Sequence, residues 1–174
     1  MNKPVVTFVA PSGTGKTTLL VKVIAELKQR GIRVGAIKHD AHRFDIDHPG
    51  KDSYRFTHAG ADTTVISSSE TLALVKRQTG SPSPDELIEA YFEDVDLVLV
   101  EGFKRSTLPK IEVHRLEGEQ NLICRGAYHD PNLLAVVSDE PLQVDVPVLD
   151  LNDPVQVAEF IIARVMQGMA RPVN

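Results

Sequence analysis

A run of small and polar residues at positions 10–18, APSGTGKTT, has the composition of a phosphate-binding (Walker A) loop. Small side chains let consecutive backbone N–H groups curve around phosphate oxygens, and Lys16 can then reach the β- and γ-phosphates. The hydroxyl of Thr17 is suited to hold Mg²⁺. A helix that begins near Gly15 would add the positive end of its dipole. The pattern therefore predicts phosphate binding by Gly13, Thr14, Gly15, Lys16, Thr17 and Thr18.

The run departs from the usual pattern at its first position, where Ala10 stands in place of glycine. Alanine tolerates positive φ less well than glycine does, so the first turn of the loop is the part that the pattern predicts least well. An accidental glycine-rich turn is the alternative. The apolar strand before the run and the amphipathic helix after it favour a functional loop.

A carboxylate that could serve the same metal follows the apolar residues at 97–100, which predict a buried strand. Glu101 at the end of this strand resembles the acid of a Walker B motif. Such an acid can coordinate Mg²⁺ directly or hold one of its waters. A glutamate at a strand end is a weak signal alone, and its combination with the loop favours the metal role.

The densest group of ionisable residues lies between Lys38 and Ser53, directly after a predicted strand. Ligands of open parallel sheets bind at the carboxyl ends of the strands, so this stretch should approach the same crevice as the loop. Asp45 and Asp47 could approach Mg²⁺ there. The cations that could meet phosphate oxygens are Lys38, Arg43 and Lys51. A solvated polar loop is the alternative for the whole stretch.

Histidines invite a transition-metal interpretation, because imidazole is a common ligand. The candidates are His39, His42, His48 and His58. No cysteine pair or histidine-rich tail accompanies them, which favours a plain polar loop. The single cysteine, Cys124, cannot form an internal disulfide and is expected to be a small buried residue.

Asp139 is a candidate for reading the nucleotide base, since it follows a predicted strand at 134–137. A carboxylate there can accept hydrogen bonds from the N1–H and N2–H₂ groups of guanine. The Asn-Lys-x-Asp pattern is absent, so a plain turn residue is an equal alternative. Asp150 is a second candidate, whereas Asp153 before Pro154 is better explained as a helix N-cap. Lys104 and Arg105 could equally contact an anion or be solvated.

The elements that must position these residues alternate between strands and helices. The pattern predicts strands at 4–10, 32–38, 63–66, 71–75, 96–101, 110–113 and 134–137, with helices at 15–30, 51–59, from 84 and at 154–166. This order predicts an α/β fold, a three-layer P-loop NTPase with a mostly parallel central sheet flanked by helices. We expect one domain over residues 1–174. Residues 117–130 are weakly patterned.

Composition excludes several classes. A net charge of −5 argues against broad nucleic-acid binding, which needs a concentrated basic surface. No apolar run approaches the roughly 20 residues that cross a bilayer, and the N-terminus lacks the form of a signal peptide. We therefore expect a cytoplasmic protein that binds neither membrane nor nucleic acid.

Several motifs occur together in the order and spacing of one family. They are the loop, Lys38-His39, the Pro-Gly-Lys-Asp-Ser stretch at 49–53, Ala-Gly-Ala at 59–61 and Val-Glu-Gly-Phe-Lys at 100–104. Over nearly its whole length the chain resembles the MobB family, accessory proteins of molybdopterin-guanine dinucleotide biosynthesis. The resemblance implies a P-loop domain that binds GTP with Mg²⁺, usually as a homodimer. It also implies work with the nucleotidyltransferase MobA, which joins GMP to the molybdenum-bearing form of molybdopterin.

Carried over by position, the resemblance implies phosphate binding by the loop and metal roles for Thr17 and Glu101, with residues 38–53 facing the nucleotide or the pterin. We expect a GTP-binding adaptor with slow hydrolysis, because no glutamine follows Glu101 to orient water and no arginine is assured near the γ-phosphate. No catalytic residue is assigned. The alternatives are a small-molecule kinase or ATP-dependent ligase on the same scaffold, and a metal-delivery GTPase.

Overall fold

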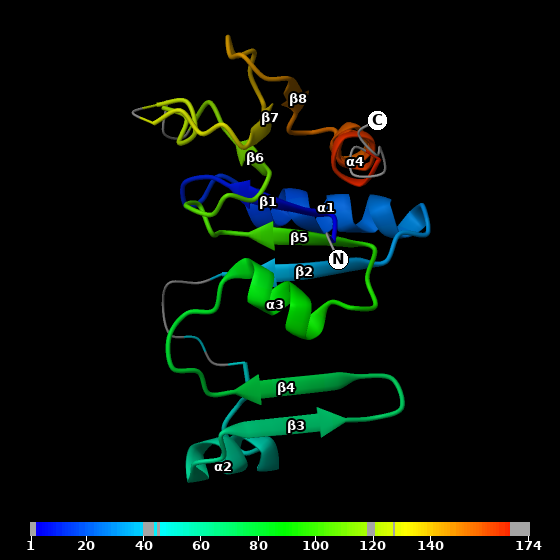
Figure 1. Ribbon diagram of the computed structural model, residues 1–174, viewed down its shortest axis with the longest axis vertical. Helices are drawn as coiled ribbons and strands as arrows, with labels where there is room; N and C mark the ends of the chain where they lie inside the picture. Colours follow the sequence, from blue (N-terminus) through cyan, green and yellow to red (C-terminus); the bar gives the residue numbers. More distant parts are fainter. Residues whose placement is uncertain (1–2, 40–43, 45, 118–120, 127, 168–174) are drawn as a thin grey trace, which may run out of the picture. The chain divides into compact units, whose positions relative to one another are not determined.

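The computed structural model describes residues 3–39, 44, 46–117, 121–126 and 128–167 (Figure 1). The chain groups into two compact units, one made of Met1–His39 with Pro84–Asn174 and the other of Asp40–Ser83. The phosphate loop and its strands belong to the first unit. The expectation of a single domain over the whole chain stays a prediction.

The first unit is built on a six-stranded sheet with the order β2-β5-β1-β6-β7-β8, in which every pair of neighbours is parallel. The strands are β1 (Val5–Val9), β2 (Val34–Lys38), β5 (Leu97–Glu101), β6 (Lys110–Val113), β7 (Leu133–Ser138) and β8 (Val148–Asp150). The predicted parallel sheet is confirmed. Strand β8 was not predicted, because three residues are too few to show a period. Parallel pairing brings the carboxyl ends of β2, β5, β1 and β6 to one edge.

Helices cover both faces of this sheet. They are α1 (Lys16–Gln29), α3 (Pro84–Tyr91), α4 (Pro154–Ile161) and the π-helix η1 (Ile162–Met166). Helices α1 and α4 pack side by side (Figure 1). Alternate residues of β5 point to opposite faces, so Leu97 and Leu99 join the core with α1 and α4, while Val98 and Val100 pack against α3. The three-layer arrangement is thereby confirmed.

The second unit contains a helix and a hairpin, α2 (Asp52–Ala59), β3 (Thr63–Ser67) and β4 (Leu72–Lys76). The strands pair antiparallel, with Thr63 opposite Lys76, which confirms the predicted hairpin. The hydroxyls of Thr57 and Thr64 lie 3.0 Å apart and join helix to hairpin. Helix α2 buries none of its residues. Within the described residues, no helix is long and apolar enough to cross a membrane.

Candidate functional site

The loop between β1 and α1 has the backbone that its glycines predict. Gly13 and Gly15 have φ of 82° and 86°, in the left-handed region that side chains rarely adopt, and Gly15 is the N-cap of α1. Phe103 is the only non-glycine residue with positive φ among the described residues. Ala10 therefore takes an ordinary conformation, and its buried methyl group packs in the core. The departure from the usual first glycine costs no backbone strain.

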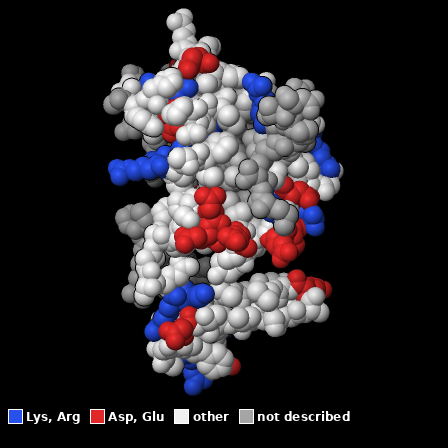
Figure 2. Space-filling view, viewed as in Figure 1, with Lys and Arg blue, Asp and Glu red and all other residues white. Residues whose placement is uncertain are grey.

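Lys16 folds back over this loop. Its Nζ donates to the carbonyl oxygens of Pro11 at 3.0 Å and Ala10 at 3.4 Å. Partial burial lowers the pKa of Lys16, Glu101 opposes the shift, and the charges of Lys104 and Lys38 add to it. Several cations thus share the neighbourhood of the loop, and Figure 2 shows basic side chains projecting at the edge where β5 ends.

The predicted metal pair comes together in the first unit. Thr17 Oγ1 donates to Glu101 Oε2 at 2.9 Å, because β5 lies beside β1 with Glu101 opposite Phe8. The described residues contain no group of three or more His, Cys, Asp or Glu side chains suited to hold a metal. One carboxylate and one hydroxyl suit Mg²⁺, which keeps several waters and takes other ligands from substrate phosphates. The donor set fits a magnesium–phosphate complex better than a transition metal.

Lys38 stands beside this pair, at the end of β2. Its Nζ lies 3.9 Å from Glu101 Oε1, and strand register places Lys38 opposite Glu101. The lysine side chain is 63% exposed, whereas that of Glu101 is 16% exposed. So exposed a cation contributes little to stability but remains available to an anion at the sheet edge.

A strained turn follows Glu101. Gly102 has φ of 110° and Phe103 has φ of 47°. The Phe103 ring stacks on His39 with centroids 4.1 Å apart, and Thr7 Oγ1 donates to the Gly102 carbonyl oxygen at 2.7 Å. A methyl group on Gly102 would lie 3.0 Å from the His39 carbonyl oxygen, so this position requires glycine. The sequence did not predict this ring stack. Gly102, directly after the strand, was the only residue that marked an unusual turn here.

Two further candidates, Asp47 and Lys51, belong to the second unit. The Ser53 hydroxyl, followed by the His48 backbone N–H, lowers the pKa of Asp47 despite desolvation. Lys51 is exposed at the N-cap of α2. Their roles toward metal and phosphate stay predictions. Asp45, His42 and Arg43 lie outside the described residues.

Asp139 has a structural partner. Its Oδ1 accepts from the backbone N–H of Leu116 at 2.9 Å, which joins the segments that follow β6 and β7. This contact accounts for Asp139 as a turn residue, and its base-reading role stays a prediction. Asp153 Oδ1 accepts from Gln156 N at 3.0 Å, so the predicted N-cap of α4 is confirmed.

A buried ionic group anchors the weakly patterned segment. Lys110 Nζ lies 2.9 Å from Asp130 Oδ2, with side chains 0% and 6% exposed. Glu112 accepts from the backbone N–H groups of Ile123 and Cys124. Burial, reinforced by Glu112, raises the pKa of the Cys124 thiol to about 12, so this cysteine is the buried, unreactive residue that was predicted.

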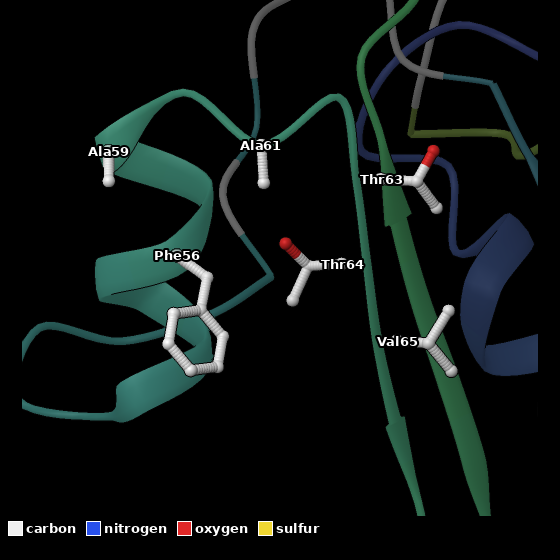
Figure 3. Close-up of a pocket in the computed structure, with 6 residues that line it drawn as sticks. All are labelled: Phe56, Ala59, Ala61, Thr63, Thr64 and Val65. Carbon is white, nitrogen blue, oxygen red and sulfur yellow. The ribbon is translucent and has the colours of Figure 1, made fainter.

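An open surface pocket of about 430 Å³ lies on the second unit (Figure 3). Phe56 on α2 faces Thr64 on β3 across it. Its lining is uncharged, namely Phe56, Ala59, Ala61, Thr63, Thr64 and Val65. Such a lining offers no cation to a phosphate, so this pocket lacks the chemistry of the site at the loop.

A glycine-rich loop that joins a buried parallel strand to a helix, with a lysine and a paired threonine and glutamate, defines a P-loop nucleotide-binding protein. The sequence model of MobB, described as molybdopterin guanine dinucleotide synthesis protein B, matches residues 5–139. The chain belongs to the MobB family.

Named relatives agree with this assignment. The chain is 42% identical over 172 residues to the molybdopterin-guanine dinucleotide biosynthesis adapter protein of Escherichia coli K12, covering 91% of both chains. It is 40% identical to the Haemophilus influenzae adapter protein, covering 91% of this chain and 87% of that one. A crystal structure of molybdopterin-guanine biosynthesis protein B matches with a TM-score of 0.73 and 28% identity, over 92% of this chain and 98% of that chain. Bacillus subtilis MobB matches with a TM-score of 0.72 and 26% identity, over 93% and 98%. These matches do not favour the kinase or ligase alternative.

Proposed function

We propose that this chain binds GTP with Mg²⁺ and acts as an accessory protein in the attachment of GMP to molybdopterin, which forms molybdopterin guanine dinucleotide. The family assignment supports the pathway. The observation that carries the nucleotide–metal site is the 2.9 Å contact between Thr17 and Glu101 directly beside the loop. A hydroxyl and a carboxylate at that place complete a magnesium site once phosphate oxygens are present.

Within the proposed site, the backbone N–H groups of Gly13 to Thr18 bind phosphate oxygens, and Lys16 exchanges its carbonyl partners for the β- and γ-phosphates. Thr17 and Glu101 hold the metal, which neutralises phosphate charge when bound. Lys38 meets phosphate from the end of β2. Asp139 reads the base. The proposed roles of Asp47 toward the metal and of Lys51 toward phosphate stay predictions of the sequence.

Hydrolysis by this site is slow. Glu101 already accepts a hydrogen bond from Thr17. No glutamine comes directly after Glu101 in the sequence to orient an attacking water. P-loop proteins that lack a supplied catalytic group hydrolyse GTP at roughly 10⁻⁴ per second. Nucleotide binding, rather than turnover, is then the working state of an adaptor.

The proposed partners are a MobA-type nucleotidyltransferase, molybdopterin and a second copy of this chain, in the cytoplasm. Support for a homodimer comes from the second unit, whose apolar side chains are unusually exposed. Phe56, Val65, Ile66 and Leu72 are 60%, 52%, 49% and 67% exposed. A small unit with so much apolar surface is expected to be covered in its assembly.

Calorimetric titration with GTP and with ATP, each with and without Mg²⁺, tests the proposal. We expect GTP to bind more tightly than ATP, and Mg²⁺ to strengthen GTP binding in the wild type but not in Thr17→Ala. A clear preference for ATP would favour a kinase or ligase instead. Turnover of GTP at tens per second without any partner would refute the adaptor role.

A further inference from the structure

Arg115 approaches the phosphate loop from the neighbouring strand. Strand β6 pairs in parallel with β1, with Val9 opposite Glu112, and Arg115 is the second residue after β6 ends. Its Nε donates to the carbonyl oxygen of Thr14 at 3.3 Å. A terminal nitrogen of the guanidinium lies 3.3 Å from the place where a Cβ on Gly15 would stand. The side chain therefore packs on the carbonyl side of the peptide that joins Thr14 to Gly15.

The orientation of this peptide decides whether the loop can offer one of its donors to a phosphate. In a planar trans peptide, the C=O of Thr14 and the N–H of Gly15 point in opposite directions. A carbonyl oxygen held toward Arg115 thus directs the N–H away from the guanidinium. Among the described residues no acceptor pairs with this N–H, which is one of the loop donors of the proposed phosphate site.

The backbone does not fix this orientation by itself. Turning the peptide over rotates ψ of Thr14 and φ of Gly15, and glycine tolerates both signs of φ at little cost. Gly15 has φ of 86°. The buried Thr14 hydroxyl donates to the Pro11 carbonyl oxygen at 3.1 Å, a contact that does not involve the C=O of Thr14. Within the part of the chain that the structure describes, Arg115 makes the only hydrogen bond to that carbonyl oxygen.

Arg115 is itself anchored on both sides by the segment that follows β7. His114 is 5% exposed, and its Nε2 lies 2.9 Å from Glu140 Oε1. The backbone N–H of Leu116 donates to Asp139 Oδ1 at 2.9 Å. The residues before and after Arg115 are therefore held in place, and the guanidinium reaches the loop from a fixed point of the backbone.

We propose that Arg115 is a positioning residue of the phosphate loop, which holds the peptide between Thr14 and Gly15 with its N–H directed toward a phosphate oxygen. It acts through the loop and does not touch the nucleotide. The inference rests on the proposed function. In the nucleotide-free protein the contact keeps the loop ready to bind, so that binding energy is not spent on turning the peptide.

Two substitutions separate the hydrogen bond from the charge. The amide nitrogen of glutamine is as many bonds from Cα as the Nε of arginine, so Arg115→Gln keeps a donor at that place and loses the charge. Arg115→Met has the same length to that point and no donor. A positioning role depends on the donor, so the glutamine variant should behave like the wild type and the methionine variant should not. Direct recognition of phosphate by the cation would be lost in both variants.

Calorimetry with GTP and Mg²⁺ measures the effect on binding by the full chain. Arg115→Met should bind roughly three- to tenfold more weakly, the change that corresponds to one ordinary hydrogen bond, and Arg115→Gln should bind nearly as the wild type. The matched control is Lys28→Met in the last turn of α1, roughly 18 Å along the helix from Lys16, which removes one positive charge and should bind as the wild type. Thermal melts establish that the variants fold like the wild type.

The orientation of the peptide can also be observed without nucleotide. The Gly15 amide signal in ¹⁵N–¹H spectra reports on this peptide, and relaxation dispersion detects exchange between two orientations on the microsecond to millisecond timescale. The Gly15 signal should be displaced or broadened by exchange in Arg115→Met and should stay close to its wild-type position in Arg115→Gln. A loss of general stability alone would lower the melting temperature without this difference between the two variants.

Wild-type GTP affinity in a folded Arg115→Met protein would overturn the inference, and so would an unchanged Gly15 signal in that variant. An Arg115→Gln protein that binds GTP as weakly as Arg115→Met would also overturn it, in favour of a role for the charge. A wild-type protein that does not bind GTP with Mg²⁺ would refute the proposed function. The Gly15 signal would then still decide whether Arg115 orients the peptide.

Discussion

Replacement of Glu101 by glutamine tests how the site uses Mg²⁺. The change keeps the shape of the side chain and an oxygen that can accept from Thr17 Oγ1, now 2.9 Å from Glu101 Oε2, but it removes the negative charge. Glutamine oxygen is a weaker ligand for a hard cation than a carboxylate is. A hydrogen bond to a charged group contributes about 1.5–3 kcal/mol, which corresponds to roughly ten- to a hundredfold in affinity.

The expected result is a selective loss. Glu101→Gln should reduce the Mg²⁺-dependent gain in GTP affinity roughly ten- to a hundredfold and leave the metal-free affinity nearly unchanged or slightly higher, since an acid no longer faces the phosphates. Calorimetric titration of GTP over a series of Mg²⁺ concentrations measures both quantities. Glu93→Gln, at an exposed acid before β5, is the control for net charge. A Glu101→Gln protein with the full magnesium response would refute the assignment of Glu101 to the metal.

Three further substitutions test interactions that stabilise the fold. Gly15→Ala forces a side chain to φ of 86° and should cost about 1–3 kcal/mol in unfolding free energy, measured by urea denaturation; an unchanged midpoint would contradict the strain. Lys110→Met leaves the buried Asp130 carboxylate unpaired and should destabilise by about 3–5 kcal/mol, with Lys110→Met/Asp130→Asn recovering part of the loss. Hydrogen bonds from Arg33 lower the pKa of Asp96 to about 2 from 3.8, so its contribution is present above about pH 4 and is lost as the pH falls toward 2. As the pH is lowered from about 4 to 2, the urea midpoint should therefore fall less steeply in Asp96→Asn than in the wild type. An equal fall in both proteins would show that Asp96 does not contribute to the pH dependence of stability.

The sequence predicted those parts of the fold whose residues lie close together in the chain. Strand β5 was visible because four apolar residues in succession suit a strand covered on both faces. The loop was visible because its glycines occupy positions that need positive φ. The meeting of Thr17 with Glu101 then followed from a general property of parallel sheets, whose strand ends share one edge.

Contacts that depend on distant segments were not predictable in the same way. Lys110 and Glu112 alternate with apolar residues in β6, a pattern typical of a strand with one solvated face. The structure buries both charges, because the segment that contains Ile123, Cys124 and Asp130 covers that face and supplies their partners. The covering segment has no period or motif that a sequence pattern could detect. The hydrogen bond from Arg115 Nε to the Thr14 carbonyl oxygen likewise joins residues far apart in the sequence, and no local pattern predicts it.

The strand order explains why this site is better suited to binding than to turnover. The order β2-β5-β1 brings Lys38, Glu101 and the loop to one sheet edge, each from a different strand. Lys16 of the loop and Lys38 can meet the charges of a triphosphate, while the single acid, Glu101, already accepts a hydrogen bond from Thr17 and is proposed to hold the metal. General-base catalysis needs a group free to take a proton from the attacking water. Because Glu101 cannot fill both roles at once, a partner that supplies a second group would be required for fast hydrolysis, and the isolated chain is expected to hold its nucleotide.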